Sequence, residues 1–301
     1  MNSKETILLA REKEIAIPAF NVAHIPMMRA IIQAVVDENS IAMVQVARVE
    51  WEKMGAGTIE ETAKEYERYG DETHTMLHLD HVPVIDEDNL DVDYRTLIKR
   101  AIDAGYQSVM IDGSRLSLDE NIKVTAEVAG MAHAAGIPFE AELGSVMGHE
   151  SGQMPPYEEI FKSKIGFTST SEAKRFVAET DVDWLSIAAG SIHGAVAEAT
   201  RNEKKPEARL DIKHIADLYN ATNKPLVLHG GSGIGAESIR NAILAGIAKI
   251  NVGTEVRQTY ELALAGNGGD IDKAQQAVYE RVREMISSFF NITNSRTLLY
   301  G

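Results

Sequence analysis

The sequence has no cysteine and no long apolar run. The lack of thiols excludes disulfide bonds, thiolate metal sites and a cysteine nucleophile, and it is typical of a cytoplasmic protein. No stretch approaches the roughly 18 uninterrupted apolar residues of a membrane span, and the N-terminal Met1-Asn2-Ser3-Lys4 leads into no signal-like segment. We therefore expect a cytoplasmic protein without a membrane partner.

Positive charge is also scarce, because 30 Lys and Arg residues face 45 Asp and Glu residues and give a formal net charge of −15. This balance argues against nucleic acid as a general partner. An anionic ligand would need a local cluster of amides or cations. The 301 residues are 44% hydrophobic and 25% charged, which is typical of a globular protein that can bury a sizeable core.

Short apolar runs alternate with amphipathic stretches along the chain. The pattern predicts strands over residues 16–21, 41–47, 75–81, 108–113, 138–144, 184–190, 225–230 and 249–254. It predicts helices over residues 27–38, 59–69, 94–104, 118–135, 172–179, 212–220, 237–245 and 256–265. Capping boxes are expected at three helix starts: Thr58 with Glu61, Ser117 with Glu120, and Ser169 with Glu172.

Eight strands that alternate with eight helices predict an α/β fold, a TIM (β/α)8 barrel. Most strands read as apolar runs rather than strict alternation, as expected in a parallel sheet covered on both faces. An open doubly wound sheet would alternate too, but polar residues here follow most strands rather than one switch point. We expect one barrel domain over residues 1–301.

Two segments depart from the repeat. Residues 148–166, rich in Gly, Ser and Pro, are predicted to form a functional loop. Residues 272–290 predict an additional C-terminal helix, a helical extension at about 271–291, packed under the barrel or against another subunit. Its apolar face comprises Ala277, Val278, Val282 and Ile286.

Chelating side chains lie at the ends of four predicted strands: His81, Glu142, His193 and His229. Strand alternation places His78 and Asp80 on one face and His81 on the other, so Asp80 and His81 can share a cavity only where the strand ends. In a functional interpretation His81 is a metal ligand and Asp80 an acid or base. The alternative is a buried histidine and a helix-capping aspartate, with His78 a core or supporting group.

Glu140 and Glu142 share one face of the fifth predicted strand. Two buried carboxylates require a cation, because isolated buried charges are costly. A salt bridge is the alternative, and the small number of Lys and Arg residues on the strands argues against it.

Glycines follow the histidines of strands six and seven, as Gly194 after His193 and Gly230-Gly231-Ser232-Gly233 after His229. They allow backbone amides to approach a ligand closely, and the eighth strand ends in Asn251-Val252-Gly253-Thr254. Loops after strands seven and eight commonly bind phosphate in such barrels. Imidazole and oxygen ligands suit Zn²⁺, so the pattern indicates metal-assisted carbon-acid chemistry on a phosphorylated ketose or ketone.

At these residues the chain resembles the class II, zinc-dependent ketose-bisphosphate aldolases, which include fructose- and tagatose-bisphosphate aldolases. The resemblance extends from about residue 17 to residue 255. It rests on six motifs: His78-Leu79-Asp80-His81, Val109-Met110-Ile111-Asp112-Gly113-Ser114, Glu140-Ala141-Glu142-Leu143-Gly144, Gly190-Ser191-Ile192-His193-Gly194, His229-Gly230-Gly231-Ser232-Gly233 and Asn251-Val252-Gly253-Thr254-Glu255.

The resemblance implies reversible aldol cleavage of a phosphorylated ketose, such as fructose 1,6-bisphosphate, to dihydroxyacetone phosphate and an aldehyde through a metal-stabilised enediolate. It implies one zinc ion per subunit, bound by His81, His193 and His229, with Glu142 as a further or alternative ligand. It also implies a monovalent cation, Na⁺ or K⁺, near the phosphate, and a homodimer or homotetramer.

The resemblance further assigns roles to individual residues. Asp80 would exchange the proton of the C4 oxygen, and Glu150 that of C3 after loop closure. Asp112 and Glu140 would support a second cation position. The dihydroxyacetone phosphate half would be held by Asn21, Gly194, Gly230, Gly231, Ser232, Asn251, Gly253 and Thr254.

Three departures from the family pattern concern the substrate. Val82 follows His81 where the family commonly has glycine, Arg48 stands after the second strand, and Arg115 replaces a usual histidine. We interpret Arg48, with Arg115, as a site for an anionic group on the aldehyde half, either phosphate, carboxylate or sulfonate, because Arg matches oxyanions with a fork of donors. Surface salt bridges to Glu50 or Asp119 are the alternative.

Three other functions remain open at this stage. A metal-dependent epimerase or isomerase would use the same enediolate without cleaving a carbon–carbon bond. A Schiff-base aldolase would need a lysine, for which Lys249 lies deep in the barrel. A non-catalytic subunit is disfavoured because Asp80, Glu150 and the three histidines are all present.

Overall fold

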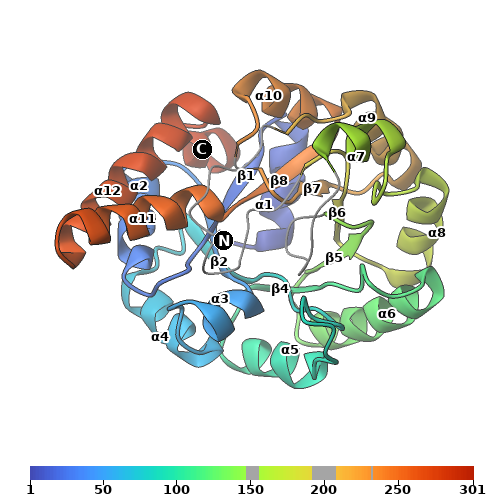
Figure 1. Ribbon diagram of the computed structural model, residues 1–301, viewed down its shortest axis with the longest axis horizontal. Coiled ribbons are helices and arrows are strands. Elements are labelled where there is room, and N and C mark those ends of the chain that lie inside the picture. Colours follow the sequence, from blue (N-terminus) through green and yellow to red (C-terminus); the bar gives the residue numbers. More distant parts are fainter. Residues whose placement is uncertain (147–155, 192–207, 232) are drawn as a thin grey trace.

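The computed structural model describes residues 1–146, 156–191, 208–231 and 233–301. Eight parallel strands close into a barrel in sequence order, and helices surround it (Figure 1). The predicted TIM barrel is confirmed. The strands are β1 (Ile17–Asn21), β2 (Ala42–Val46), β3 (Thr75–Leu79), β4 (Ser108–Ile111), β5 (Phe139–Leu143), β6 (Trp184–Ile187), β7 (Leu226–Leu228) and β8 (Ile247–Val252).

The helices include all eight that were predicted, and the boxes at Thr58 and Ser117 form as expected. Four further helices were not predicted: α1, α3, α7 and α13. The prediction of a loop over 148–166 is wrong in part, because α7 lies within it. The helices are α1 (Ser3–Glu12), α2 (Met27–Asp37), α3 (Arg48–Lys53), α4 (Ile59–Tyr69), α5 (Tyr94–Asp103), α6 (Leu118–Ala134), α7 (Tyr157–Ser163), α8 (Thr170–Thr180), α9 (Ile212–Thr222), α10 (Ala236–Ala245), α11 (Thr254–Gly266), α12 (Ile271–Glu284), the π-helical η1 (Met285–Phe289) and α13 (Ser295–Tyr300).

Each strand is buried along its whole length. On β3, Leu77 and Leu79 pack outward in the core shared with the helices. Met76 points into the barrel, where it belongs to a second apolar cluster. Burial on both faces explains why the strands are apolar rather than alternating in sequence.

One irregularity interrupts the barrel at β8. Leu226 pairs with Ile247, but the next residue, Val227, pairs with Lys249, so Ala248 is an extra residue in β8. Such a bulge changes the side-chain phase of a strand, because a slip of one residue turns every later side chain to the other face. Ala248 lies in the apolar cluster inside the barrel, and Lys249 after it also points inward, toward Glu140.

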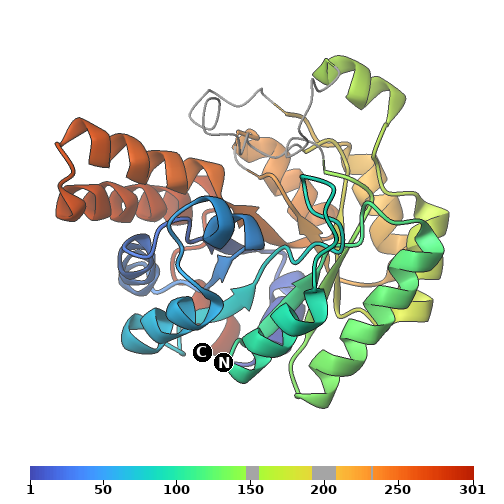
Figure 2. The same cartoon turned by 60° about the horizontal axis from the view of Figure 1, so that its bottom comes forward.

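The end of the barrel at which the strands begin is filled by apolar side chains. Met43, Met76, Trp184 and Val227 form a cluster there with Ile7 of α1 and Leu299 of α13. Both chain termini lie at this end (Figure 2). The two terminal helices therefore close the barrel opposite the end where the predicted site residues lie.

The additional C-terminal helix, α12, packs beside the barrel against α11 and α2 rather than under it (Figure 1). Its buried face consists of Ala274, Val278 and Val282, and η1 continues this face with Met285 and Ile286. Among the residues described, no helix is long and apolar enough to cross a membrane.

Candidate functional site

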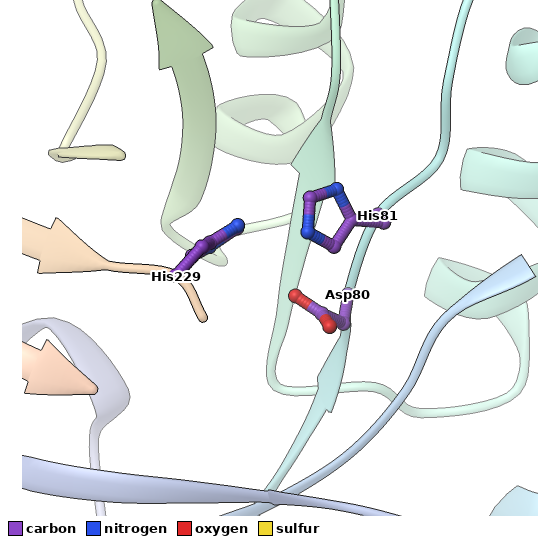
Figure 3. A group of neighbouring side chains, drawn as sticks. All are labelled: Asp80, His81 and His229. Carbon is purple, nitrogen blue, oxygen red and sulfur yellow. The ribbon is translucent and has the colours of Figure 1, made fainter. Parts of the chain in front are cut away.

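Asp80, His81 and His229 meet at the end of the barrel where the strands finish. One ligand atom of each lies within 4.8 Å of the others, and Figure 3 shows the three side chains pointing toward one another from the ends of β3 and β7. Asp80 and His81 follow Leu79, the last residue of β3. Since strand alternation no longer applies there, neighbouring residues can point into the same space, as predicted.

Glu142 and Asp112 bring carboxylates to the same histidines. Glu142 Oε2 lies 3.2 Å from His229 Nδ1 and 3.7 Å from His81 Nδ1, and Asp112 Oδ2 lies 3.4 Å from His81 Nδ1. This buried Glu142 oxygen accepts no hydrogen bond from the described residues. Ligand atoms bound to zinc at about 2.0–2.1 Å in a tetrahedron are about 3.4 Å apart. The spacing of these side chains therefore fits a zinc ion.

The electrostatic environment favours positive charge at this cluster. Burial by itself lowers the pKa of His81, but the carboxylates of Asp80, Asp112 and Glu142 outweigh burial and raise it to about 10. A group of carboxylates that stabilises a proton on an imidazole also stabilises a metal ion in its place. The cluster therefore fits a cation in charge as well as in spacing.

Glu140 has a different environment from Glu142. Its Oε2 accepts hydrogen bonds from Lys249 Nζ at 2.8 Å and Trp184 Nε1 at 2.7 Å, and its Oε1 accepts one from His229 Nε2 at 2.8 Å. The salt-bridge alternative is thus realised at Glu140, and the argument against it from the scarcity of strand lysines is wrong. A second cation position at Asp112 and Glu140 stays a prediction, which this ion pair weakens.

His78 is fully buried beside this pair, with Nδ1 2.8 Å from Ser108 Oγ and Nε2 3.7 Å from Glu140 Oε2. Burial, with the charge of Lys249, lowers the pKa of His78 to about 3. A neutral, hydrogen-bonded imidazole fits the supporting role expected for His78.

Asp80 is held by two asparagines. Asn21 Nδ2 donates to Asp80 Oδ2 and Asn251 Nδ2 donates to Asp80 Oδ1, both at 2.9 Å. Burial by itself raises the pKa of Asp80, but the positive charges of His81 and Lys249 lower it to about 2. Asp80 is therefore a fixed carboxylate next to the histidine cluster, and the helix-capping alternative is not what the structure shows.

Glu50 also belongs to this network, although the sequence suggested only a surface salt bridge for it. Its Oε2 accepts from Ala47 N at 2.7 Å and lies 3.3 Å from Asn21 Nδ2. Gln45 Nε2 donates to Asn21 Oδ1 at 2.8 Å, so the amide of Asn21 has a single orientation. The available signal was a glutamate three residues after Ala47, the residue that precedes α3, which is a helix-start pattern.

The predicted phosphate site is described in part. Gly253 directly precedes α11, which starts at Thr254, so backbone amides at this helix N-terminus can face an anion. Gly231 lies close to β8, and a Cβ there would be 2.6 Å from Ile250 Cγ2 and 3.2 Å from Asn251 O. Gly230 has a φ of +69°, which favours glycine. Glu150, His193, Gly194 and Ser232 lie outside the described residues.

Arg48 and Arg115 line one small pocket of about 60 Å³ together with His81 and Asp112. Arg48 Nη1 lies 3.2 Å from Asp86 Oδ2, and Arg115 Nη1 donates to Asn89 Oδ1 at 3.0 Å. Arg48 therefore does not pair with Glu50, and Asp119 pairs with Arg175 instead. Both arginines therefore border the same pocket as His81 of the cluster.

A closed parallel barrel with histidines and carboxylates at the carboxyl ends of its strands defines the class of α/β-barrel proteins with a candidate metal centre. The sequence model of one family, "Fructose-bisphosphate aldolase class-II", matches residues 1–297. The chain therefore belongs to the class II fructose-bisphosphate aldolase family, and the resemblance noted from the motifs is confirmed.

Known proteins agree with this assignment. Over 180 residues the chain is 41% identical to a 6-phospho-5-dehydro-2-deoxy-D-gluconate aldolase of Shouchella clausii, a match covering 60% of this chain and 53% of that protein. Over 257 residues it is 32% identical to a fructose-bisphosphate aldolase of Staphylococcus epidermidis, covering 85% and 81%. The crystal structure of the YdjI aldolase from Escherichia coli K12 superimposes with a TM-score of 0.76 and 26% identity, covering 97% of this chain and 98% of that one.

Proposed function

We propose that the protein is a zinc-dependent aldolase that reversibly cleaves a phosphorylated ketose to dihydroxyacetone phosphate and an aldehyde. The carrying observation is that His81 Nδ1 and His229 Nδ1 both lie near the buried Glu142 Oε2, directly beside the fixed carboxylate of Asp80. The roles proposed for Asp80, His81, Glu142 and His229 draw on this geometry, whereas those of Glu150, His193, Gly194 and Ser232 draw on the family resemblance alone.

In the cleavage direction, Asp80 takes the proton of the C4 hydroxyl group. The C4–O electrons then form the aldehyde carbonyl, the C3–C4 bond breaks, and its electron pair remains on C3 as an enediolate. A zinc ion held by His81, His229 and Glu142, with His193, would supply Lewis-acid stabilisation of that negative charge. Glu150 then returns a proton to C3, which completes dihydroxyacetone phosphate.

Asn21 and Asn251 keep the Asp80 carboxylate directed at the C4 oxygen, since each donates to one of its oxygens. Gly230, Gly231, Gly253 and Thr254, with Gly194 and Ser232, would hold the phosphate through backbone amides and the α11 N-terminus. Two further expectations belong to this proposal: a Na⁺ or K⁺ ion near the phosphate, and a homodimer or homotetramer.

A Schiff base at Lys249 is disfavoured by the same contacts. Lys249 is fully buried, and its ammonium is ion-paired to Glu140 at 2.8 Å. Imine formation needs a neutral amine with access to the substrate carbonyl, and this ion pair opposes both.

The deciding experiment measures triose release from a panel of ketose phosphates by zinc-loaded protein, with EDTA-treated protein as the control. We expect cleavage of at least one member and its loss in EDTA. Release of an isomeric sugar without triose would instead support the epimerase or isomerase. Cleavage that survives EDTA would favour the imine mechanism, and no reaction with any member would overturn the proposal.

We further propose that the pocket at Arg48 and Arg115 binds an anionic group on the aldehyde half. His81 and Asp112 also line this pocket, so it adjoins the histidine cluster. The Shouchella clausii relative is named for a gluconate, a substrate with a carboxylate far from its phosphate, which favours carboxylate among the candidate anions.

This second proposal is tested by Arg48→Ala, assayed in the condensation direction with a carboxylate-bearing aldehyde and with a neutral aldehyde of similar length. Loss of a bidentate contact of about 1.5–3 kcal/mol should lower kcat/KM for the acid roughly 10- to 100-fold and leave the neutral aldehyde unaffected. Arg175→Ala, which removes a surface ion pair with Asp119, is the matched control. Equal loss for both aldehydes would contradict an anion site.

A further inference from the structure

We infer that Glu140 and Lys249 are positioning residues for His229: Glu140 fixes the orientation of the imidazole, and Lys249 supplies the counter-charge that would otherwise have to come from a second metal ion. The inference rests on the zinc centre of the proposed function, and it changes the role expected for Glu140 from cation ligand to support of a ligand.

The orientation of His229 follows from its contact with Glu140. A carboxylate accepts hydrogen bonds, so Nε2 of His229, 2.8 Å from Glu140 Oε1, carries a proton. The other ring nitrogen, Nδ1, faces Glu142 Oε2 at 3.2 Å. This is the arrangement in which a carboxylate sets the tautomer and direction of a metal-binding imidazole.

Lys249 explains how Glu140 can be charged at this depth. Glu140, His229 and Lys249 are each completely buried, where a lone carboxylate would be strongly destabilised. Lys249 Nζ and Trp184 Nε1 both donate to Glu140 Oε2. With both oxygens engaged in this way, Glu140 needs no metal ion to satisfy it.

The bulge in β8 is what places the ammonium there. Regular alternation from the outward-facing Ile247 would turn Ala248 inward and Lys249 outward, into the core between barrel and helices, but the bulge allows Ala248 and Lys249 both to point inward. An ion pair that only stabilises the fold needs no strand irregularity. The bulge places Lys249 inside the barrel, next to the proposed ligand His229, which favours a role in supporting that ligand.

The chain provides a matched control for a purely structural role. Asp183 also joins a lysine to a histidine, with Lys4 Nζ 2.7 Å from Oδ1 and His133 Nε2 2.9 Å from Oδ2. It precedes β6, at the end of the barrel opposite the histidine cluster. Asp183→Asn therefore removes the same kind of carboxylate without touching a candidate metal ligand.

The test compares Glu140→Gln, Glu140→Gln/Lys249→Met and Asp183→Asn with the wild-type protein. Zinc affinity is measured by competition with a chromogenic chelator, ligand geometry by the visible spectrum of the Co²⁺-substituted protein, and stability by the Tm of the metal-free protein. The double variant guards against misfolding, because it leaves no lysine buried without a counter-charge.

We expect both Glu140 variants to bind zinc about 10- to 100-fold more weakly with an altered Co²⁺ spectrum, while Asp183→Asn retains wild-type values. The double variant should recover Tm relative to Glu140→Gln without recovering zinc affinity. Wild-type zinc affinity in both Glu140 variants, or an equal loss in Asp183→Asn, would overturn the inference. Wild-type protein that binds zinc but cleaves no ketose phosphate would refute the proposed function alone.

Discussion

The two ends of the barrel interior are filled in different ways, although the same strands supply both. At the end closed by α1 and α13, Met43, Met76 and Trp184 form an apolar cluster. Toward the open end, β3 continues from Met76 to His78 and Asp80, and β5 supplies Glu140 and Glu142. On β3 a distance of two residues thus separates a packed core from a charged layer.

The difference shows what each end needs in order to be stable. The closed end is stabilised by burial and close packing, which have no direction. In the charged layer, Asp80 is matched to two asparagine amides and Glu140 to Lys249, Trp184 and His229. Side chains can therefore be exchanged among similar shapes at the closed end, whereas exchange at the open end must preserve donors and charges.

The largest expected effect comes from removing a proposed metal ligand at the open end. His81→Ala should abolish stoichiometric zinc binding and lower kcat/KM about 10³-fold or more, because a metal ion contributes several kcal/mol of transition-state stabilisation. Zinc content by mass spectrometry and steady-state aldol cleavage measure this. His133→Ala, which changes a histidine at the opposite end, should retain zinc and activity. Full activity in His81→Ala would show that the open end does not depend on a metal centre at His81.

A second substitution at the open end separates proton transfer from metal binding. Asp80→Asn keeps the size of the side chain but cannot accept the C4 proton, and general acid–base catalysis commonly contributes about 10²- to 10⁴-fold. We expect kcat to fall within that range while zinc affinity stays within a few-fold of wild type. Parallel loss of zinc and activity would show that Asp80 acts as a ligand instead.

At the closed end the expected loss is in stability. Met76→Ala removes a fully buried side chain and should lower the free energy of unfolding by about 2–5 kcal/mol through lost burial and a residual cavity. At a temperature where the variant is folded, kcat/KM should remain close to wild type. Urea titration and aldol cleavage are the measurements. A large loss of activity in the folded variant would mean that the two ends are coupled.

The remaining prediction concerns the pH dependence of stability at Glu50, at the border of the charged layer. Burial raises its pKa from an ordinary 4.5 to about 8, against the opposing hydrogen bond from Ala47 N. Between these values the folded protein binds more protons than the unfolded chain, so stability must fall as pH rises. Glu50→Gln removes this dependence. Its free energy of unfolding should therefore rise relative to that of the wild type, by at most about 1.4 kcal/mol per pH unit from pH 5 to 8. The free energy of unfolding of both proteins is measured by denaturant titration at several pH values. If the difference between them does not change from pH 5 to 8, the raised pKa of Glu50 is refuted.

Sequence periodicity predicted the barrel because most strands covered on both faces form short apolar runs, and because capping residues mark many of the helix starts. It missed α7, although Pro156 followed by Glu158 and Glu159 is a recognisable helix start. It also missed α3, which is six residues long and whose start is capped by the carboxylate of its own Glu50.

For the site, the ends of strands identified Asp80, His81, Glu142 and His229 because each side chain needs only its own strand to be placed. The partner of Glu140 could not be identified in this way. Lys249 is 109 positions away in sequence, and its direction depends on a bulge that depends on the pairing of β7 with β8. Pairing across the barrel is a property of the closed sheet, not of any one segment.

The extra residue in β8 also limits how this protein can be recombined with its relatives. If β8 alternated regularly through Ala248, every residue would be unchanged in identity, yet Lys249 and Asn251 would turn toward the helices and Ile250 and Val252 into the barrel. A chimera with its junction inside β8 must therefore conserve the number of residues as well as their types. A junction after Val252 would carry no such constraint, which makes the start of α11 the safer place to exchange segments.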